Sequence, residues 1–204
     1  MHISEGILSA PVLATGIACA AAGVAVGLKK IDYDRMPKVA ILSATFFVAS
    51  LIHVPIGPSS VHLVLNGLIG LLLGWVAFPA IMIALLLQAV LFQFGGLTTL
   101  GINTTTMALP AVICFYIFRC RVMSKNDWIS AISAFACGFT SVALGAILVA
   151  LFLVFTENAF LAPAKLILAA HLPVMVIEGI ITAFCIAFLK KVKPELLEVD
   201  HDME

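Results

Sequence analysis

Apolar runs fill most of this sequence and restrict what the chain can fold into. Of its 204 residues, 63% are hydrophobic and 11% are charged, whereas a soluble domain carries roughly 25% charged residues. A soluble fold could not bury so much apolar surface, but an apolar run of about 20 residues can cross a bilayer as a helix. The candidate segments are residues 7–28, 39–56, 61–78, 79–94, 105–119, 128–155 and 166–189. We therefore expect an all-α integral membrane protein, a bundle of about seven transmembrane helices.

The basic residues predict how this bundle is oriented. Ten of the eleven lie after the first, fifth and last segments: Lys29, Lys30, Arg35, Lys38, Arg119, Arg121, Lys125, Lys190, Lys191 and Lys193. Because Lys and Arg stay on the cytoplasmic side, we expect the N-terminus outside and the C-terminus in the cytoplasm, which requires an odd number of spans. The expected organisation is a single transmembrane domain over residues 1–193 and a short cytoplasmic tail over residues 194–204, in the inner (plasma) membrane.

Several function classes lack their usual signatures in this sequence. No basic stretch suggests nucleic acid as a partner, and no phosphate loop or common hydrolase motif is present. The five cysteines form no CxxC pair, and we interpret them as small core residues. An intramembrane enzyme and a non-selective structural or channel subunit remain open as alternatives to a selective binding protein.

Polar residues concentrate on the side that the topology places outside. They lie in the N-terminus up to Glu5, in residues 53–62, in residues 95–106 and at His171. We expect these stretches to line a cavity that opens outward.

The start of the chain has the groups of a metal chelate. No Lys or Arg precedes the first apolar run, so we expect no secretory signal, and the bulk of His2 should protect Met1 from removal. The Met1 amine, the His2 amide nitrogen and the His2 imidazole Nδ1 can bind one ion in a five- and a six-membered ring. Planar nitrogen coordination favours Ni(II) or Cu(II), with Co(II) less ready to displace the amide proton. His62 is the best candidate for a fourth nitrogen, and His53 is either an alternative ligand or a core histidine.

The loop expected between the fourth and fifth segments has the composition of a re-entrant loop. Residues 93–106 contain two adjacent glycines and many hydroxyls, including those of Thr98 and Thr99, and non-helical backbone at membrane depth must line a cavity or be buried in protein. Asn103 could orient a ligand imidazole or only satisfy loop backbone. Glu5 would add negative charge near an incoming cation.

The last segment carries an acid inside its apolar run. Glu178 lies seven residues after His171, on nearly the same helix face, and ionisable residues at membrane depth usually face the bundle interior. Either side chain could help to hold a cation. The alternative is that Glu178 makes a hydrogen bond or ion pair that fixes the segment.

Four motifs together resemble a known family. They are Met1-His-Ile-Ser-Glu-Gly6, the region around Ser60-Val-His62, Gly95-Gly-Leu-Thr-Thr-Leu-Gly-Ile-Asn103 followed by Met107-Ala108, and Val176-Ile-Glu-Gly179. The chain resembles the CbiM/NikM family, the substrate-capture (S) components of energy-coupling-factor transporters for cobalt and nickel. The resemblance covers nearly the whole chain.

This resemblance implies a function, a ligand set and partners. The implied substrate is Co2+ or Ni2+, held by Met1, His2 and a histidine at the position of His62. The implied partners are a membrane coupling (T) subunit, cytoplasmic ATPase subunits and in some cases a small accessory membrane subunit. On this reading the chain is not itself an enzyme, because ATP hydrolysis belongs to the partner subunits. The sequence does not distinguish cobalt from nickel.

Overall fold

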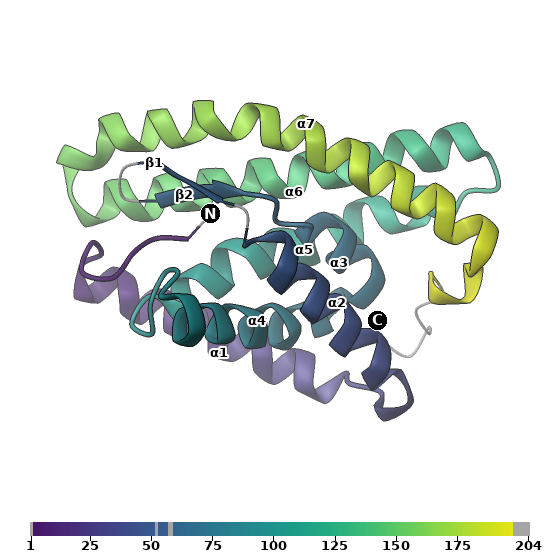
Figure 1. Ribbon diagram of the computed structural model, residues 1–204, viewed down its shortest axis with the longest axis horizontal. Coiled ribbons are helices and arrows are strands. Elements are labelled where there is room, and N and C mark those ends of the chain that lie inside the picture. Colours follow the sequence, from purple (N-terminus) through teal and green to yellow (C-terminus); the bar gives the residue numbers. More distant parts are fainter. Residues whose placement is uncertain (1, 52, 57–58, 198–204) are drawn as a thin grey trace.

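The computed structural model describes residues 2–51, 53–56 and 59–197 of the chain (Figure 1). The α-helices are α1 Ala10–Lys29, α2 Met36–Ala49, α3 Asn66–Leu73, α4 Ala77–Phe92, α5 Leu100–Val122, α6 Asp127–Thr156 and α7 Leu161–Val192. Short 3-10 turns are η1 Tyr33–Arg35, η2 Gly74–Val76, η3 Asn158–Phe160 and η4 Pro194–Leu196. Two strands, β1 His53–Ile56 and β2 Ser59–His62, complete the fold. The prediction of a largely helical protein is confirmed.

Five helical segments in the described residues are long and apolar enough to cross a membrane: Ala10–Lys29, Asn66–Phe92, Leu100–Val122, Asp127–Thr156 and Asn158–Val192. The predicted third and fourth segments therefore combine into one candidate span, in which η2 joins α3 to α4. Helix α2 has 14 residues and falls short of that length. The count of seven transmembrane helices stays a prediction.

A β-hairpin replaces helical ends in the predicted segments 39–56 and 61–78. Strands β1 and β2 pair antiparallel, with His53 opposite His62 and Ile56 opposite Ser59. The sequence between the helices explains the difference, because Pro55 and Pro58 lack the amide proton that a helix needs and force the preceding residue into an extended conformation. His53 and His62, the two candidates for a fourth metal ligand, are thus direct backbone partners across the hairpin.

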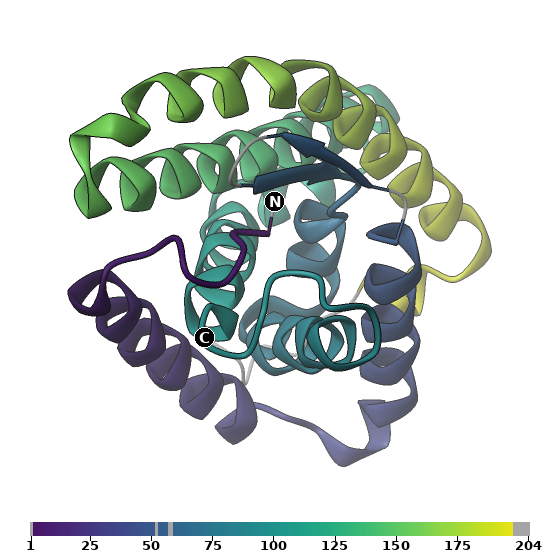
Figure 2. The ribbon, with the colours of Figure 1, turned by 60° about the vertical axis from the view of Figure 1, so that its left-hand side comes forward.

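The helices surround this hairpin and the N-terminal segment. Helix α7 packs along α6, α6 packs on α5, and α1 and α2 lie against α5 and α4 respectively. Figure 2 shows the segment before α1 turning inward and ending beneath the hairpin. In an apolar 18-residue stretch of the Asn66–Phe92 segment, 83% of the residues are buried, whereas the share is 28% in the corresponding stretches of α1 and of the Asn158–Val192 segment. The first is therefore central, and the other two lie at the periphery of the bundle.

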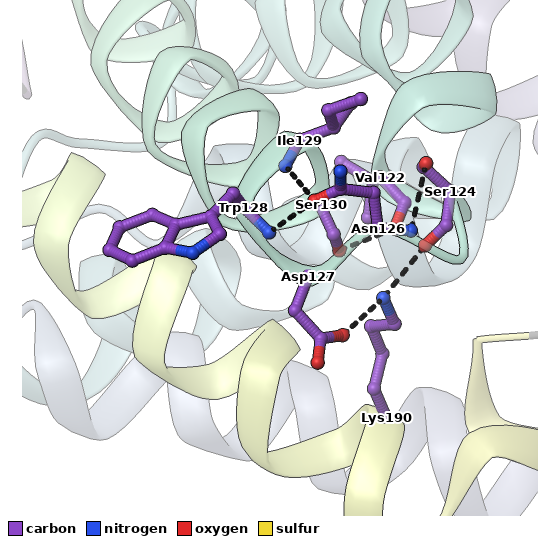
Figure 3. A network of polar contacts seen from close by, with 8 residues as sticks. All are labelled: Val122, Ser124, Asn126, Asp127, Trp128, Ile129, Ser130 and Lys190. Carbon is purple, nitrogen blue, oxygen red and sulfur yellow. Dashed lines mark hydrogen bonds and ion pairs between the residues drawn. The ribbon is translucent and has the colours of Figure 1, made fainter.

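A polar network (Figure 3) joins the α5–α6 turn to α7 at the end of the bundle that lies away from the hairpin (Figure 1). The Asn126 side chain caps α6 by accepting from the Trp128 and Ile129 amides at 3.0 and 3.4 Å. Lys190 near the end of α7 donates to the Ser124 carbonyl at 2.8 Å and pairs with Asp127 at 3.2 Å. These contacts join the α5–α6 turn to α7.

The beginning of the predicted tail packs against the same end. Lys38 Nζ donates to the Leu196 carbonyl at 2.7 Å, and Leu197 is buried. Residues 198–204 of the predicted tail lie outside the described residues.

Candidate metal site

The N-terminal segment is held in the bundle by the side chain of Asn103 in the first turns of α5. The Ile3 amide donates to Asn103 Oδ1 at 2.9 Å, and Asn103 Nδ2 donates to the Ile3 carbonyl at 3.1 Å. Nδ2 also donates to Thr99 Oγ1 at 3.2 Å. Asn103 therefore pairs with the backbone as a neighbouring strand would. Asn103 therefore positions the predicted ligand His2 indirectly, by holding the backbone of Ile3.

The loop before α5 receives the other end of this segment. The Thr98 amide donates to Glu5 Oε1 at 2.9 Å. This hydrogen bond joins Glu5 to the loop that the predicted topology places on the same side of the bundle. Gly95 and Gly96 have φ of +75° and +153°, values that favour glycine. A Cβ on Gly95 would lie 2.8 Å from Asn103 Nδ2, and one on Gly96 would overlap the Glu5 side chain. The two glycines make room for the N-terminal segment.

The predicted re-entrant loop is shorter than the sequence suggested. Helix α5 begins at Leu100, so only residues 93–99 are loop, and the expectation of non-helical backbone up to residue 106 is wrong. The hydroxyls that suggested a loop bond to helix carbonyls: Thr105 donates to Gly101 and Gly16, and Thr106 donates to Asn103. Such back-bonding satisfies Thr within an apolar helix.

The imidazoles of His2 and His62 lie together at the centre of the candidate site. Their ring centroids are 4.7 Å apart with an angle of 36° between the planes, and both residues are buried, with 5% and 3% of their surface exposed. Segments sixty residues apart in the sequence thus bring two ring systems within reach of one small ion. Met1 lies outside the described residues.

Hydrogen bonds fix which ring nitrogen of each histidine carries the proton. His2 Nε2 lies 2.8 Å from Gln88 Oε1, and His62 Nδ1 lies 2.7 Å from the Leu63 carbonyl. Both oxygens can only accept, so both nitrogens must donate. The lone pair therefore resides on Nδ1 of His2 and on Nε2 of His62. Burial lowers the pKa of His62 well below its ordinary value of 6.5, which keeps His62 neutral.

Glu178 supports the turn that follows His62. Its Oε1 accepts from the Val64 and Leu65 amides, the latter at 2.9 Å, and Oε2 lies 3.0 Å from the Leu65 amide. Leu65 has φ of +53° at the N-cap of α3, a left-handed conformation that is unfavourable for leucine. The carboxyl group thus holds a strained turn and satisfies two buried amides just before α3.

His171 lies on the same helix and is fully buried. Its Nδ1 donates to the Ile167 carbonyl at 2.7 Å, and its Nε2 has no hydrogen-bond partner among the described residues. The His53 side chain lies outside the described part of the structure, and only its backbone pairing with His62 is known. Within the described residues, no three His, Cys, Asp or Glu side chains are close enough together to hold a metal ion. A site at His2 and His62 therefore needs further donors, such as backbone or terminal nitrogens.

Comparison with known proteins identifies the family. The family described as "Cobalt uptake substrate-specific transmembrane region", CbiM, matches residues 2–196. The chain belongs to the CbiM family.

Relatives of this CbiM-family chain cover almost its whole length. It is 43% identical over 201 residues to a "Putative metal transport protein" of Haemophilus influenzae, with 97% of each chain covered. It is 30% identical to the "Cobalt transport protein CbiM" of Sorangium cellulosum, with 97% and 95% covered. It is 33% identical to the "Fused nickel transport protein NikMN" of Rhodobacter capsulatus, covering 97% of this chain and 64% of that protein. A crystal structure of a transition metal transporter superposes with a TM-score of 0.83 at 28% identity, with 94% and 93% covered.

Sequence reasoning missed one residue of the site in the CbiM-family chain. Gln88 is fully buried in α4 and contacts His2 directly. The signal was present, because Gln88 is the only amide within the apolar residues 79–92, and a polar group at membrane depth needs a partner.

Replacing Gly96 with alanine tests how closely the N-terminal segment fits the loop. The new methyl group would displace Glu5 and adopt an unfavourable φ, which typically costs about 1–3 kcal/mol. For a chain of this size we expect the thermal midpoint in detergent to fall by roughly 3–10 °C. Leu97→Ala is the control, since Leu97 is an exposed neighbour in the same loop. An unchanged midpoint for Gly96→Ala would contradict the packing described.

Proposed function

We propose that the protein is the metal-capturing subunit of an energy-coupling-factor importer of Co2+ or Ni2+. The metal ion, which is the transported substrate, is held by the Met1 amine, the His2 amide nitrogen and imidazole Nδ1, and His62 Nε2. One observation carries this proposal: the hydrogen bonds of two adjacent buried imidazoles leave the lone pairs on Nδ1 of His2 and Nε2 of His62.

The unprotonated ring nitrogen of His2, Nδ1, is the one that a chelate with the residue's own backbone amide requires. Only Nδ1 is near enough to the backbone to close a six-membered ring with an ion bound at the residue's own amide nitrogen. His62 comes from a different element and needs its distal nitrogen, Nε2, to reach the same ion. Ligating histidines commonly donate their other N–H to a carbonyl, as the two rings do toward Gln88 and Leu63.

The surrounding residues have distinct roles in this proposal. Asn103 and Glu5 hold the N-terminal segment in place, and Thr98 and Thr99 contribute the loop that receives it. Glu178 holds the turn after His62. Burial lowers the pKa of His62, which keeps its Nε2 unprotonated at neutral pH. Burial of both rings excludes water, which would otherwise compete for the ion.

Names of the relatives support the transport role and the need for partners. They include nickel and cobalt transport proteins, and several are named as fused proteins, among them the NikMN protein of Rhodobacter capsulatus and a putative CbiMQ protein of Methanocorpusculum labreanum. We propose that the partners of this chain are a membrane coupling subunit, ATPase subunits that hydrolyse ATP, and a small accessory membrane subunit. The site faces outward from the inner membrane, and the basic end of the bundle faces the cytoplasm.

Binding of Ni(II) to the purified protein in detergent tests the proposal. We expect about one ion per chain, with the visible absorption of planar nitrogen coordination. Because the amine, with a pKa of about 7.7–8.0, and the amide must each lose a proton, the affinity should fall as the pH is lowered. His62 is already neutral and adds no proton to this balance. Between pH 7.5 and 6.5 the affinity should fall roughly 50- to 100-fold. A channel or enzyme without this chelate would show no such dependence, and a flat profile would overturn the proposal.

A further inference from the structure

Gln88 occupies an unusual place in the bundle. Its side-chain amide is fully buried, and every other residue of α4 is apolar. Its three polar contacts join three elements: Oε1 accepts from His2 Nε2 at 2.8 Å, and Nε2 donates to the Phe47 carbonyl at 3.2 Å and to Ser50 Oγ. A buried amide with every contact satisfied is stabilised in one orientation.

Helix α2 decides which way the Gln88 amide points. The Phe47 carbonyl can only accept a hydrogen bond. Ser50 Oγ donates its own proton to the Phe46 carbonyl at 2.8 Å, so it too acts as an acceptor toward Gln88. Turning the amide over would place Oε1 against these two acceptors and Nε2 against the N–H of His2. The end of α2 therefore locks Oε1 toward His2.

We propose that Gln88, oriented by the end of α2, is the positioning residue that makes His2 bind metal through Nδ1. This inference rests on the proposed function of the site. Because Oε1 can only accept, the proton of the neutral ring must stay on Nε2, and Nδ1 must keep its lone pair. Without that acceptor the ring is free to protonate Nδ1 instead, and the six-membered chelate ring cannot close.

The same end of α2 also leads to the second ligand. Ser50 is the C-cap residue of α2, and β1 begins at His53 and pairs with β2, which ends at His62. The contact of Gln88 with Phe47 and Ser50 thus ties the ring of His2 to the base of the hairpin that carries His62. Gln88 thus contacts both the ring of His2 and the end of the helix that precedes β1.

Nitrogen-15 spectra of the histidine rings in the metal-free, detergent-solubilised protein test this role directly. The His2 signals, assigned with a His2→Gln variant, should show a protonated Nε2 and an unprotonated Nδ1. In Gln88→Leu this pattern should be lost, and Ni(II) affinity should fall about 10- to 100-fold, as is typical when the partner of a ligating histidine is removed. Gln88→Glu keeps an acceptor toward His2 and should keep the proton on Nε2, but it sets a second oxygen against the Phe47 carbonyl, so its loss of affinity should be measurable and smaller than that of Gln88→Leu.

Ser43→Ala is the matched control. Ser43 Oγ donates to the Ala80 carbonyl at 2.8 Å and so also joins α2 to α4, away from His2. It should leave both the spectrum and the affinity as in the wild type. An Nδ1–H signal for wild-type His2, or wild-type spectrum and affinity in Gln88→Leu, would overturn the inference. Failure of the wild type to bind Ni(II) would instead refute the proposed function, while the metal-free spectrum still decides the role of Gln88.

Discussion

A flexible extension of about ten Gly and Ser residues before Met1 is expected to abolish high-affinity binding of Ni(II) and Co(II). The extension converts the Met1 amine into an amide and leaves His2 inside a chain. One donor is thereby lost, and the five-membered ring can no longer start from an amine. Since removing a mere partner of a ligand costs 10- to 100-fold, we expect a loss of more than about 100-fold. A longer extension is needed because an amine two residues before a histidine is itself a chelator of Ni(II) and Cu(II).

The same ten residues placed after Glu204 provide the control, and isothermal titration in detergent measures both proteins. The C-terminal extension should bind like the wild type, and His62→Ala should lose affinity with its terminus unchanged. If the N-terminal extension bound as tightly as the control, the ion would be held by internal groups. His62, His171 and Glu178 would then be the residues to examine, and the terminal chelate would be wrong.

The sequence predicted the helical bundle and most of the residues that gather at the site. The apolar runs marked α1, α5, α6 and α7 because a span requires a long apolar segment whatever its packing. The topology placed His2, His62 and the loop before Asn103 on one side. Whether the predicted metal ligands lie close together depends on how the ends of these segments pack. Figure 2 shows that the N-terminal segment lies next to the hairpin, near the centre of the bundle.

What the sequence left unsettled depended on contacts between distant side chains. The hairpin was missed although Pro55 and Pro58 signalled extended backbone, because hydropathy alone reads residues 53–56 as the end of a helix. Residues His2 and Gln88 are 86 positions apart, so no local pattern connects them. The choice between a cation ligand and a structural role for Glu178 likewise depended on whether backbone amides lie within reach of its carboxyl group.

Replacing Glu178 with leucine should be the most destabilising change in the site. The substitution leaves the Val64 and Leu65 amides buried without an acceptor, and an unpaired buried N–H costs about 1–3 kcal/mol. The left-handed Leu65 also loses the contact that holds its backbone. We expect a total loss of roughly 2–6 kcal/mol, which for a chain of this size lowers the thermal midpoint by roughly 5–20 °C. Ni(II) affinity should fall with it, because the turn follows His62 directly.

Glu178→Gln separates hydrogen-bond acceptance from charge. The amide retains an oxygen at the position of Oε1, which accepts from both Val64 and Leu65, so this variant should keep most of the stability and most of the Ni(II) affinity. Thermal unfolding and Ni(II) titration of both variants in the same detergent give the comparison. If glutamine were as damaging as leucine, the negative charge rather than the acceptor would hold the turn, either toward the start of α3 or toward the bound cation. Thermal unfolding with added Ni(II) distinguishes these two roles of the charge. If the carboxylate acts on the cation, Ni(II) should raise the thermal midpoint of the wild type but not that of Glu178→Gln.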